Sequence, residues 1–252
     1  MVRMEPVTAA PRLRRFRLYF LPAAVAVGLG VSVLVFLQLR GSPNDGEILN
    51  QPFLTDRLVS HVVLSVVSFA IITAIAVPLG VVIAEAGRAL RLPVFLLANL
   101  GQAVPGIGIL VLLYALLGLG AAPAVIALVV YGTLPVLRNT VAGIQGVDPA
   151  AVEAARGMGM TRWQALVRVQ LPLASPLIFA GLRTSLVLVI GTATLGNFIG
   201  ARGLGDVIAS GINISDRIVF VGAVMVATLA LLADWALSLL ENALVPRRAA
   251  VA

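Results

Sequence analysis

The stretch from Leu92 to Leu137 contains no charged residue. A helix that crosses the hydrocarbon core of a bilayer needs about 20 mostly apolar residues. The stretch is too long for one such helix and suits two. Gly118, Gly120 and Pro123 mark the turn between the two helices, because glycine and proline favour turns. The segment therefore predicts an all-α protein embedded in a membrane.

Four other apolar runs have the length of a membrane span. They cover 18–39, 58–83, 176–199 and 218–240. The basic residues before the first run resemble the start of a signal peptide, but the run is too long and lacks a clean cleavage site. Loops are expected at the polar segment 40–57 and at the Gly-rich segment 200–217. The chain is therefore predicted to be a polytopic protein of about six transmembrane helices.

The composition excludes several classes of protein. Charged residues make up 12% of the chain, whereas a soluble domain has about 25%. All 18 basic residues are Arg, so the chain has no P-loop, which needs a Lys to reach the nucleotide phosphates. The absence of Cys and the single His exclude a disulfide framework and a multi-His metal site. We expect no catalytic residue, no metal and no cofactor on this chain.

The distribution of Arg residues predicts the orientation in the membrane. With the N-terminus in the cytoplasm, thirteen of the 18 Arg residues fall in cytoplasmic segments and four outside. Cytoplasmic loops carry such an excess, so the basic pI of about 11.3 indicates membrane topology rather than nucleic-acid binding. The predicted division is a cytoplasmic basic N-terminus at 1–17, a first transmembrane helix and outer loop at 18–57, a transmembrane core at 58–240 with a cytoplasmic loop at 139–172, and a cytoplasmic tail at 241–252.

The loop at 139–172 carries a spaced signature. It reads Glu-Ala-Ala, three residues, Gly, nine residues, an aliphatic residue, one residue, and Leu-Pro. The positions are filled by Glu153, Ala154, Ala155, Gly159, Val169, Leu171 and Pro172. This segment resembles the "EAA loop" of the membrane subunit of a bacterial ATP-binding-cassette importer, apart from Val169, where Ile is usual. The resemblance implies the type I importer fold, docking onto an ATPase through these residues, and ATP and Mg²⁺ bound by that partner.

Local sequence signals predict two short helices in this loop. Asp148 is a good N-cap for the first, and Gly157 and Gly159 break it. Thr161 and Gln164 form a capping box that starts the second, and the Leu-Pro dipeptide of the signature ends it. Such a segment can seat in a groove of a soluble partner, or it can lie on the membrane as an amphipathic interfacial helix.

Further motifs narrow the family. They are His61-Val-Val-Leu-Ser-Val, Pro78-Leu-Gly80, Gln102-Ala-Val-Pro105, Ala180-Gly-Leu-Arg183-Thr-Ser, Ile190-Gly-Thr-Ala-Thr-Leu195 and Ile199-Gly-Ala-Arg-Gly-Leu-Gly205. Over about 58–207 the chain resembles the glycine betaine/carnitine/choline permease family, although Pro105-Gly-Ile-Gly replaces the frequent Pro-Ser-Leu-Ala. The resemblance implies a bacterial cytoplasmic membrane location in contact with lipid, an external binding protein, two ATPases, and a second permease that is a copy or a paralogue.

Other functions stay open at this point. A permease of a methionine-type importer shares the number of spans and the loop. A channel or a secondary transporter needs no ATPase-docking loop and works in isolated form. A membrane enzyme needs convergent acids, bases or metal ligands at membrane depth, and only Arg183 and Asp234 are available within the spans.

A small set of polar residues lies within the apolar spans. They are Asn99, Gln102, Thr192, Thr194 and Asn197. Each either lines a low-affinity solute path or forms hydrogen bonds between spans. His61, the single histidine, is read as a hydrogen-bonding residue at the interface rather than as a gate. Quaternary ammonium ligands bind aromatic cages, and the scattered aromatic residues place that recognition on an external protein.

Arg183 and Asp234 are the charges inside the fifth and sixth predicted spans. Arg183 follows Pro176 by seven residues, and Asp234 precedes Leu240 by six. At about 1.5 Å of rise per residue, both lie roughly 10 Å from the same membrane face. Equal depth on consecutive antiparallel helices allows the two side chains to form an ion pair. In the alternative, Arg183 extends to the interface and Asp234 faces another helix or a water-filled cavity.

Overall fold

A computed structural model describes residues 25–245 except 26, 30, 40 and 87. Every regular element in that part of the chain is a helix. Four of these helices are long and apolar enough to cross a membrane, or five if a bent pair counts as one span. The predicted all-α membrane fold is therefore confirmed. The segments 1–17 and 246–252 lie outside the described residues, as does part of the run 18–39, whose described residues from Val27 to Gln38 are helical.

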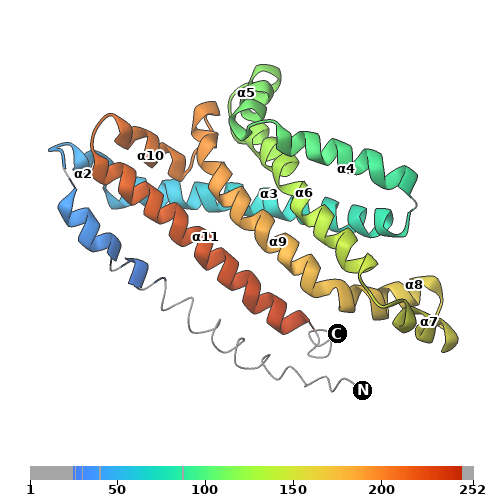
Figure 1. Cartoon of the computed structure of the whole chain (residues 1–252). Coiled ribbons are helices and arrows are strands. Elements are labelled where there is room, and N and C mark those ends of the chain that lie inside the picture. Colours follow the sequence, from blue (N-terminus) through green and yellow to red (C-terminus); the bar gives the residue numbers. More distant parts are fainter. Residues whose placement is uncertain (1–24, 26, 30, 40, 87, 246–252) are drawn as a thin grey trace, which may run out of the picture.

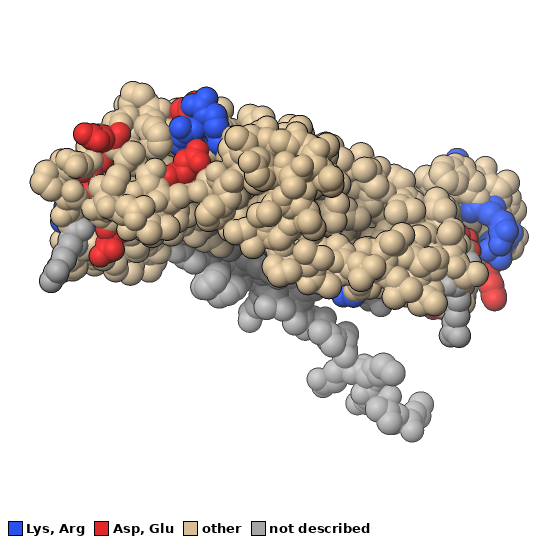
Figure 2. Space-filling view, turned by 90° about the horizontal axis from the view of Figure 1, so that it is seen from above, with Lys and Arg blue, Asp and Glu red and all other residues tan. Residues whose placement is uncertain are grey.

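The helices form an elongated bundle (Figure 1). In chain order they are α2 Asp45–Ile48, α3 Gln51–Glu85, α4 Arg88–Ala103, α5 Gly106–Leu117, α6 Ala121–Gln145, α7 Pro149–Gly157, α8 Arg162–Ala165, the π-helix η1 Leu166–Gln170, α9 Leu171–Ala193, the 3₁₀-helix η2 Thr194–Ile199, α10 Leu204–Ile212 and α11 Asp216–Leu244. Helices α7 and α8 form one end of the bundle, which we call the coupling end because it carries residues expected to dock onto an ATPase. Helices α2 and α10 lie at the opposite end, which we call the distal end. On the face in Figure 2, charged side chains gather mainly near these two ends.

The core lies between α3, α6 and α9. Their backbones approach closely at glycines: a Cβ on Gly132 would lie 2.5 Å from the Cδ1 of Ile72, and one on Gly181 would lie 2.9 Å from the Pro135 carbonyl oxygen. Ser185 is fully buried and donates a hydrogen bond of 2.8 Å to the Gly132 carbonyl. Small residues drive helix association in lipid, because close backbone approach increases van der Waals contact.

The prediction of a loop over 40–57 was wrong for most of that segment. It contains α2 and the first turns of α3, which begins at Gln51. Asn50 is the N-cap of α3 and accepts a hydrogen bond of 2.9 Å from the Phe53 N–H. Pro52 lies in the first turn, where its missing N–H costs no helical hydrogen bond. Asn50 and Pro52, which favour loops in general, therefore mark the start of a long helix here.

The uncharged stretch is divided differently from the prediction. The turn at Gly118 and Gly120 is confirmed, and both have positive φ angles of 83° and 132°. The preceding span is not straight, because α4 and α5 meet at an angle of 95°. Pro105 is the N-cap residue of α5 and cannot donate the hydrogen bond that would continue α4. The path from α4 to α5 is therefore a broken span or a re-entrant loop.

The predicted helix end at Pro172 was also wrong. The helix runs without interruption from Arg162 to Ile199. In η1 the Leu171 N–H bonds to the Leu166 carbonyl, which is the i→i+5 pattern of a π-turn. This turn resets the register, so Pro172 lies in the first turn of α9 rather than in the interior of an α-helix.

The Gly-rich segment 200–217 contains a helix that sequence reasoning missed. Helix α10 packs its buried Leu204 and Val207 against α11 and the start of α3. Its glycines are positions of close approach: a Cβ on Gly211 would lie 2.5 Å from the backbone nitrogen of Val219. The glycines therefore reflect tight packing around α10 rather than an unstructured connection.

Helix α11 is longer than predicted. It continues past the predicted end at Leu240 to Leu244.

Candidate functional site

The coupling end is built by capping interactions of the backbone. Asp148 is the N-cap of α7 and accepts a hydrogen bond of 2.9 Å from the Ala150 N–H. At the end of α7 the Met160 N–H bonds to the Ala155 carbonyl at 3.2 Å, and the Gly159 N–H bonds to Arg156 at 2.9 Å. These two bonds form a Schellman motif. It requires a residue with positive φ, which Gly159 supplies at 83°.

The second short helix starts as predicted. The Thr161 hydroxyl accepts from the Gln164 N–H, and the Gln164 side chain accepts from the Thr161 N–H at 2.9 Å. The capping box is therefore confirmed. It satisfies two backbone donors at the start of α8 without help from the rest of the protein, so the corner between α7 and α8 keeps its shape at the surface.

The signature residues fall into two structural groups. Glu153, Ala154 and Gly159 are exposed at the coupling end, whereas Ala155 is buried. The other group consists of Val169, Leu171 and Pro172, which are partly buried and lie in η1 and the first turn of α9. The first part of the signature, apart from Ala155, therefore lies at the surface, and its last three residues form the junction between that surface and a long apolar helix.

Two exposed apolar side chains flank the glycine corner. Met158 is 72% exposed and Trp163 is 69% exposed. Trp163 lies in the second predicted short helix, and sequence reasoning gave neither Trp163 nor Met158 a role of its own. The available signal was the placement of two large apolar residues around Gly159, where a helix ends and no core is within reach. Large exposed apolar side chains at the same end of the bundle as the exposed Glu153 are anchors of the type found at protein interfaces.

Arg183 and Asp234 lie in contact, as the spacing argument anticipated. The Arg183 Nε is 2.7 Å from Asp234 Oδ1, and Nη2 is 2.9 Å from Oδ2, so the pair is bidentate. A second carboxylate, missed in the sequence, belongs to Glu241, whose Oε2 is 3.6 Å from Arg183 Nη1. Glu241 follows Asp234 by two helical turns, a spacing that places both on one face of α11. The cluster joins α9 to α11.

The five polar residues proposed for a path do not form one group. Asn99 of α4 donates to its own helix at the Phe95 carbonyl and accepts from Arg138 of α6. Gln102 ties α4 to α6 by donating to the Tyr131 carbonyl at 3.0 Å. These bonds match the alternative in which such residues join helices.

Thr192, Thr194 and Asn197 lie toward the distal end. The bend between α4 and α5 reaches Thr192, because a Cβ on Gly106 would lie 3.4 Å from the Thr192 Cγ2. Thr194 donates to the Gly191 carbonyl at 2.7 Å, and Asn197 lines a cavity. A broken helix beside polar residues is the arrangement in which many transporters form their solute path.

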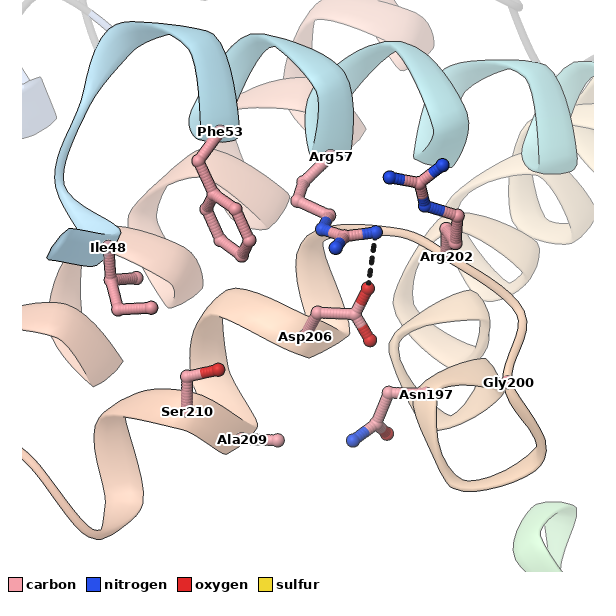
Figure 3. Close-up of a pocket in the computed structure, with 9 residues that line it drawn as sticks. All are labelled: Ile48, Phe53, Arg57, Asn197, Gly200, Arg202, Asp206, Ala209 and Ser210. Atoms are coloured by element: carbon pink, nitrogen blue, oxygen red, sulfur yellow. Dashed lines mark ion pairs between the residues drawn. The ribbon is translucent and has the colours of Figure 1, made fainter.

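A cavity of about 430 Å³ lies at the distal end, between α2, α3, η2 and α10. Figure 3 shows Arg57 reaching from α3 to Asp206 of α10, with Asn197 projecting from η2 toward the same space. The Arg57 Nη1 is 3.1 Å from Asp206 Oδ2, and its guanidinium lies 4.7 Å from the Phe53 ring centroid. Outside this pair, Arg202 Nη2 contacts Asp56 at 2.9 Å. The charges are balanced, with two Arg and two Asp residues.

His61 lies inside the bundle. Its side chain is fully buried, with both ring nitrogens in hydrogen bonds to the backbone of other helices. The expectation of hydrogen bonding is confirmed, and the long helix α3 carries the ring to a place between α9 and α10.

The fold matches that of solved importer permeases. A chain of the MetNI methionine ABC transporter, solved in inward-facing conformations, aligns with a TM-score of 0.70 at 23% identity, over 79% of this chain and 100% of that one. This likeness shows the fold alone. The architecture is therefore that of the type I importer fold.

Sequence comparisons identify the family. A model described as "Binding-protein-dependent transport system inner membrane component" matches residues 76–245. The carnitine transport permease protein OpuCD of Listeria monocytogenes is 40% identical over 199 residues, 78% of this chain and 89% of that protein. The glycine betaine/carnitine/choline transport system permease protein OpuCB of Bacillus subtilis is 38% identical over 216 residues, 85% of this chain and 94% of that protein. The chain belongs to the family of binding-protein-dependent transport system inner membrane components.

Proposed function

We propose that this permease carries a quaternary ammonium osmoprotectant, such as glycine betaine, choline or carnitine, into the cell. The proposal is supported by the names of the two relatives, which together span all three solutes. A methionine-type solute has less support, because the likeness to the methionine transporter is one of fold at 23% identity. A channel or a secondary transporter is disfavoured by family membership, since the family depends on binding proteins.

The observation that carries the coupling role is the exposed surface of α7 and α8. Glu153, Met158 and Trp163 are exposed there, and no other part of the described chain covers them. We propose that they seat in a groove of a separate ATPase, which binds ATP and Mg²⁺. This assignment places the coupling end in the cytoplasm and gives both termini a cytoplasmic location. An external binding protein then delivers the solute at the distal end, to this chain paired with a second permease.

Helix α9 is the element that links ATPase docking to the membrane. Because α8, η1 and α9 are one uninterrupted helix, a displacement of the docked segment moves α9 along with it. The bidentate contact between Arg183 and Asp234 transfers that displacement to α11. At its other end α9 leads into η2, which carries Thr194 and Asn197. Rigid coupling through packed helices is the usual physical basis of such transmission.

Uptake by the complete complex in proteoliposomes tests the coupling role. Glu153→Ala should leave membrane insertion intact and weaken both ATPase association and solute uptake. Glu47→Ala is the matched control, because Glu47 is also an exposed carboxylate but lies at the distal end. Unchanged uptake in Glu153→Ala, with full ATPase association, would refute the assignment. Uptake by the permease without its ATPase would instead support a channel or a secondary transporter.

Competition experiments with the same complex test the solute. Glycine betaine, choline and carnitine should each reduce uptake of a labelled osmoprotectant, whereas methionine should not. If methionine competes and the quaternary amines do not, the methionine-type alternative is correct. The two experiments are independent, because the coupling assignment does not depend on which solute is carried.

A further inference from the structure

His61 joins three helices at a point that its sequence position does not reveal. Its Nε2 lies 3.0 Å from the Ile190 carbonyl oxygen of α9, and its Nδ1 lies 3.3 Å from the backbone nitrogen of Leu204 in α10. The side chain is completely shielded from solvent. A backbone carbonyl only accepts and a backbone N–H only donates. The neutral ring must therefore carry its proton on Nε2 and accept at Nδ1.

The Ile190 carbonyl needs this donor because α9 changes its helical form directly after it. In an α-helix the Thr194 N–H would bond to Ile190, but here it turns to the Gly191 carbonyl as the 3₁₀-helix η2 begins. The change would leave a buried carbonyl without its helical donor, which costs free energy in an apolar environment. The His61 Nε2–H replaces that donor. The histidine thus compensates for the transition from α9 to η2.

The Leu204 N–H needs an acceptor for a different reason. Leu204 is the first residue of α10, and the first N–H groups of a helix have no acceptor within the helix. Leu204 is fully buried, so water does not serve this donor. The His61 Nδ1 accepts it, and the histidine therefore satisfies one group from each of two helices.

The backbone around the ring leaves no room for side chains. A Cβ on Gly203 would lie 2.9 Å from the His61 Nδ1, and one on Gly205 would lie 1.9 Å from the Thr194 carbonyl oxygen. Both glycines belong to the Gly-rich segment that sequence reasoning treated as a connection. Their role here is to let α10 approach His61 and the start of η2.

We infer that His61 is a positioning residue for transport. Its Nε2-protonated ring stabilises the 3₁₀ end of α9 and holds α10 against α3, and this fixes the places of Thr194 and Asn197. Without the ring, the Ile190 carbonyl regains a donor if α9 extends by one α-helical turn. That extension rotates η2 and moves both polar residues. His61 therefore acts through the geometry of η2 and not by contact with the solute.

The ring can be observed directly, because this is the single histidine of the chain. The permease is purified with a tag that contains no histidine, labelled with ¹⁵N-histidine, and studied by NMR in lipid nanodiscs at neutral pH. We expect a pyrrole-type Nε2 with an attached proton and a pyridine-type Nδ1. A proton on Nδ1, or on both nitrogens, would overturn the inference. This measurement does not depend on the identity of the solute or on the ATPase.

Three variants separate the two hydrogen bonds in the complete transporter. His61→Gln keeps a donor near the Nε2 position, His61→Asn keeps an acceptor near the Nδ1 position, and His61→Leu keeps neither. Ser65→Ala is the matched control, because Ser65 lies one turn away on α3, is equally buried, and has no hydrogen-bond partner for its hydroxyl among the described residues. The measured quantity is the number of solute molecules taken up per ATP hydrolysed.

The functional arm rests on the proposed transport function. We expect His61→Leu, which leaves both the Ile190 carbonyl and the Leu204 N–H without their partner, to lower the ratio of uptake to ATP hydrolysis at least about tenfold, because one unpaired buried group alone accounts for about that factor. His61→Gln should recover more of the ratio than His61→Asn, since the Ile190 contact is the shorter. A ratio in His61→Leu equal to that of Ser65→Ala overturns the inference. If the unmodified complex shows no ATP-driven uptake, the transport proposal has failed, and the NMR result still decides the tautomer.

Discussion

The coupling end and the distal end of the bundle keep their shapes by different means. At the coupling end, backbone capping interactions define the corner, and Glu153, Met158 and Trp163 stay exposed. At the distal end, α10 is held by a buried histidine, by glycines in close contact with neighbouring backbone, and by the ion pair between Arg57 and Asp206. The coupling end is the surface that we propose an ATPase covers. The distal end is held mainly by contacts within the chain.

This difference predicts where substitutions act on stability and where they act on transport. A change at the distal end breaks packing inside the chain, so the folded state itself should lose stability. A change at the coupling corner leaves the packed bundle intact and alters a surface, so binding of the partner should suffer instead. Arg183 lies between the two, within α9, and should affect both.

The largest effect is expected for Gly205→Ala. The new Cβ would lie 1.9 Å from the Thr194 carbonyl oxygen, which is backbone and moves only with the helix. Overpacking of this kind costs about 3 kcal/mol, and we expect a clear fall in the thermal unfolding midpoint in detergent. Gly191→Ala is the control, since a Cβ there meets nothing within 4 Å. Equal midpoints for the two variants would show that α10 does not pack on η2 as described.

The next effect concerns the ion pair within the bundle. Arg183→Met or Asp234→Leu leaves a charge in a largely apolar setting, so each single variant should lose about 2 kcal/mol, less than for a fully buried pair because both side chains are about one-fifth exposed. The double variant should lose less than the Arg183→Met variant, which leaves both Asp234 and Glu241 uncompensated. Unfolding midpoints of the four proteins form a double-mutant cycle. Additive losses would contradict the pairing.

A smaller effect is expected at the coupling corner. Gly159→Ala places a Cβ on a residue with φ of 83°, which costs about 1 kcal/mol. Partner binding that requires the corner should weaken about fivefold, measured as ATPase co-purification over a concentration series. Gly157→Ala, two residues away in α7, has a helical φ and open space for the methyl group, so it should bind normally. A shared loss in both variants would point to the surface rather than to the corner.

The smallest effect is expected at the exposed pair of the distal end. Arg202 is 63% and Asp56 44% exposed, so Arg202→Ala should cost about 0.5 kcal/mol or less. The difference in unfolding midpoint from the unmodified protein should disappear in about 1 M salt, where screening is nearly complete. A loss that persists at high salt would indicate that Arg202 is needed for packing around the cavity as well as for charge.

Local sequence signals predicted much of the coupling end correctly. The capping box at Thr161, the N-cap at Asp148 and the glycine corner at Gly159 are all present. Such signals work because a cap is satisfied by residues within one turn of it. A separate argument, equal depth on consecutive helices, anticipated the contact between Arg183 and Asp234. It did not reveal Glu241, which lies at the end of the predicted span, where charged residues are ordinary.

The sequence by itself determined the membrane class, the spaced signature and the family, because hydropathy and fixed residue spacing are properties of the chain alone. Tertiary structure decided that Pro172 lies in a continuous helix and that the span containing Pro105 is bent by 95°. It further decided that Gly203 and Gly205 lie in close contact with His61 and Thr194. It also decided the partners of His61, which lie 129 and 143 residues away along the chain. A proline or a glycine has the same local preference in every setting. Whether it ends a helix, bends one or admits a neighbour depends on which backbone groups the rest of the fold brings to it.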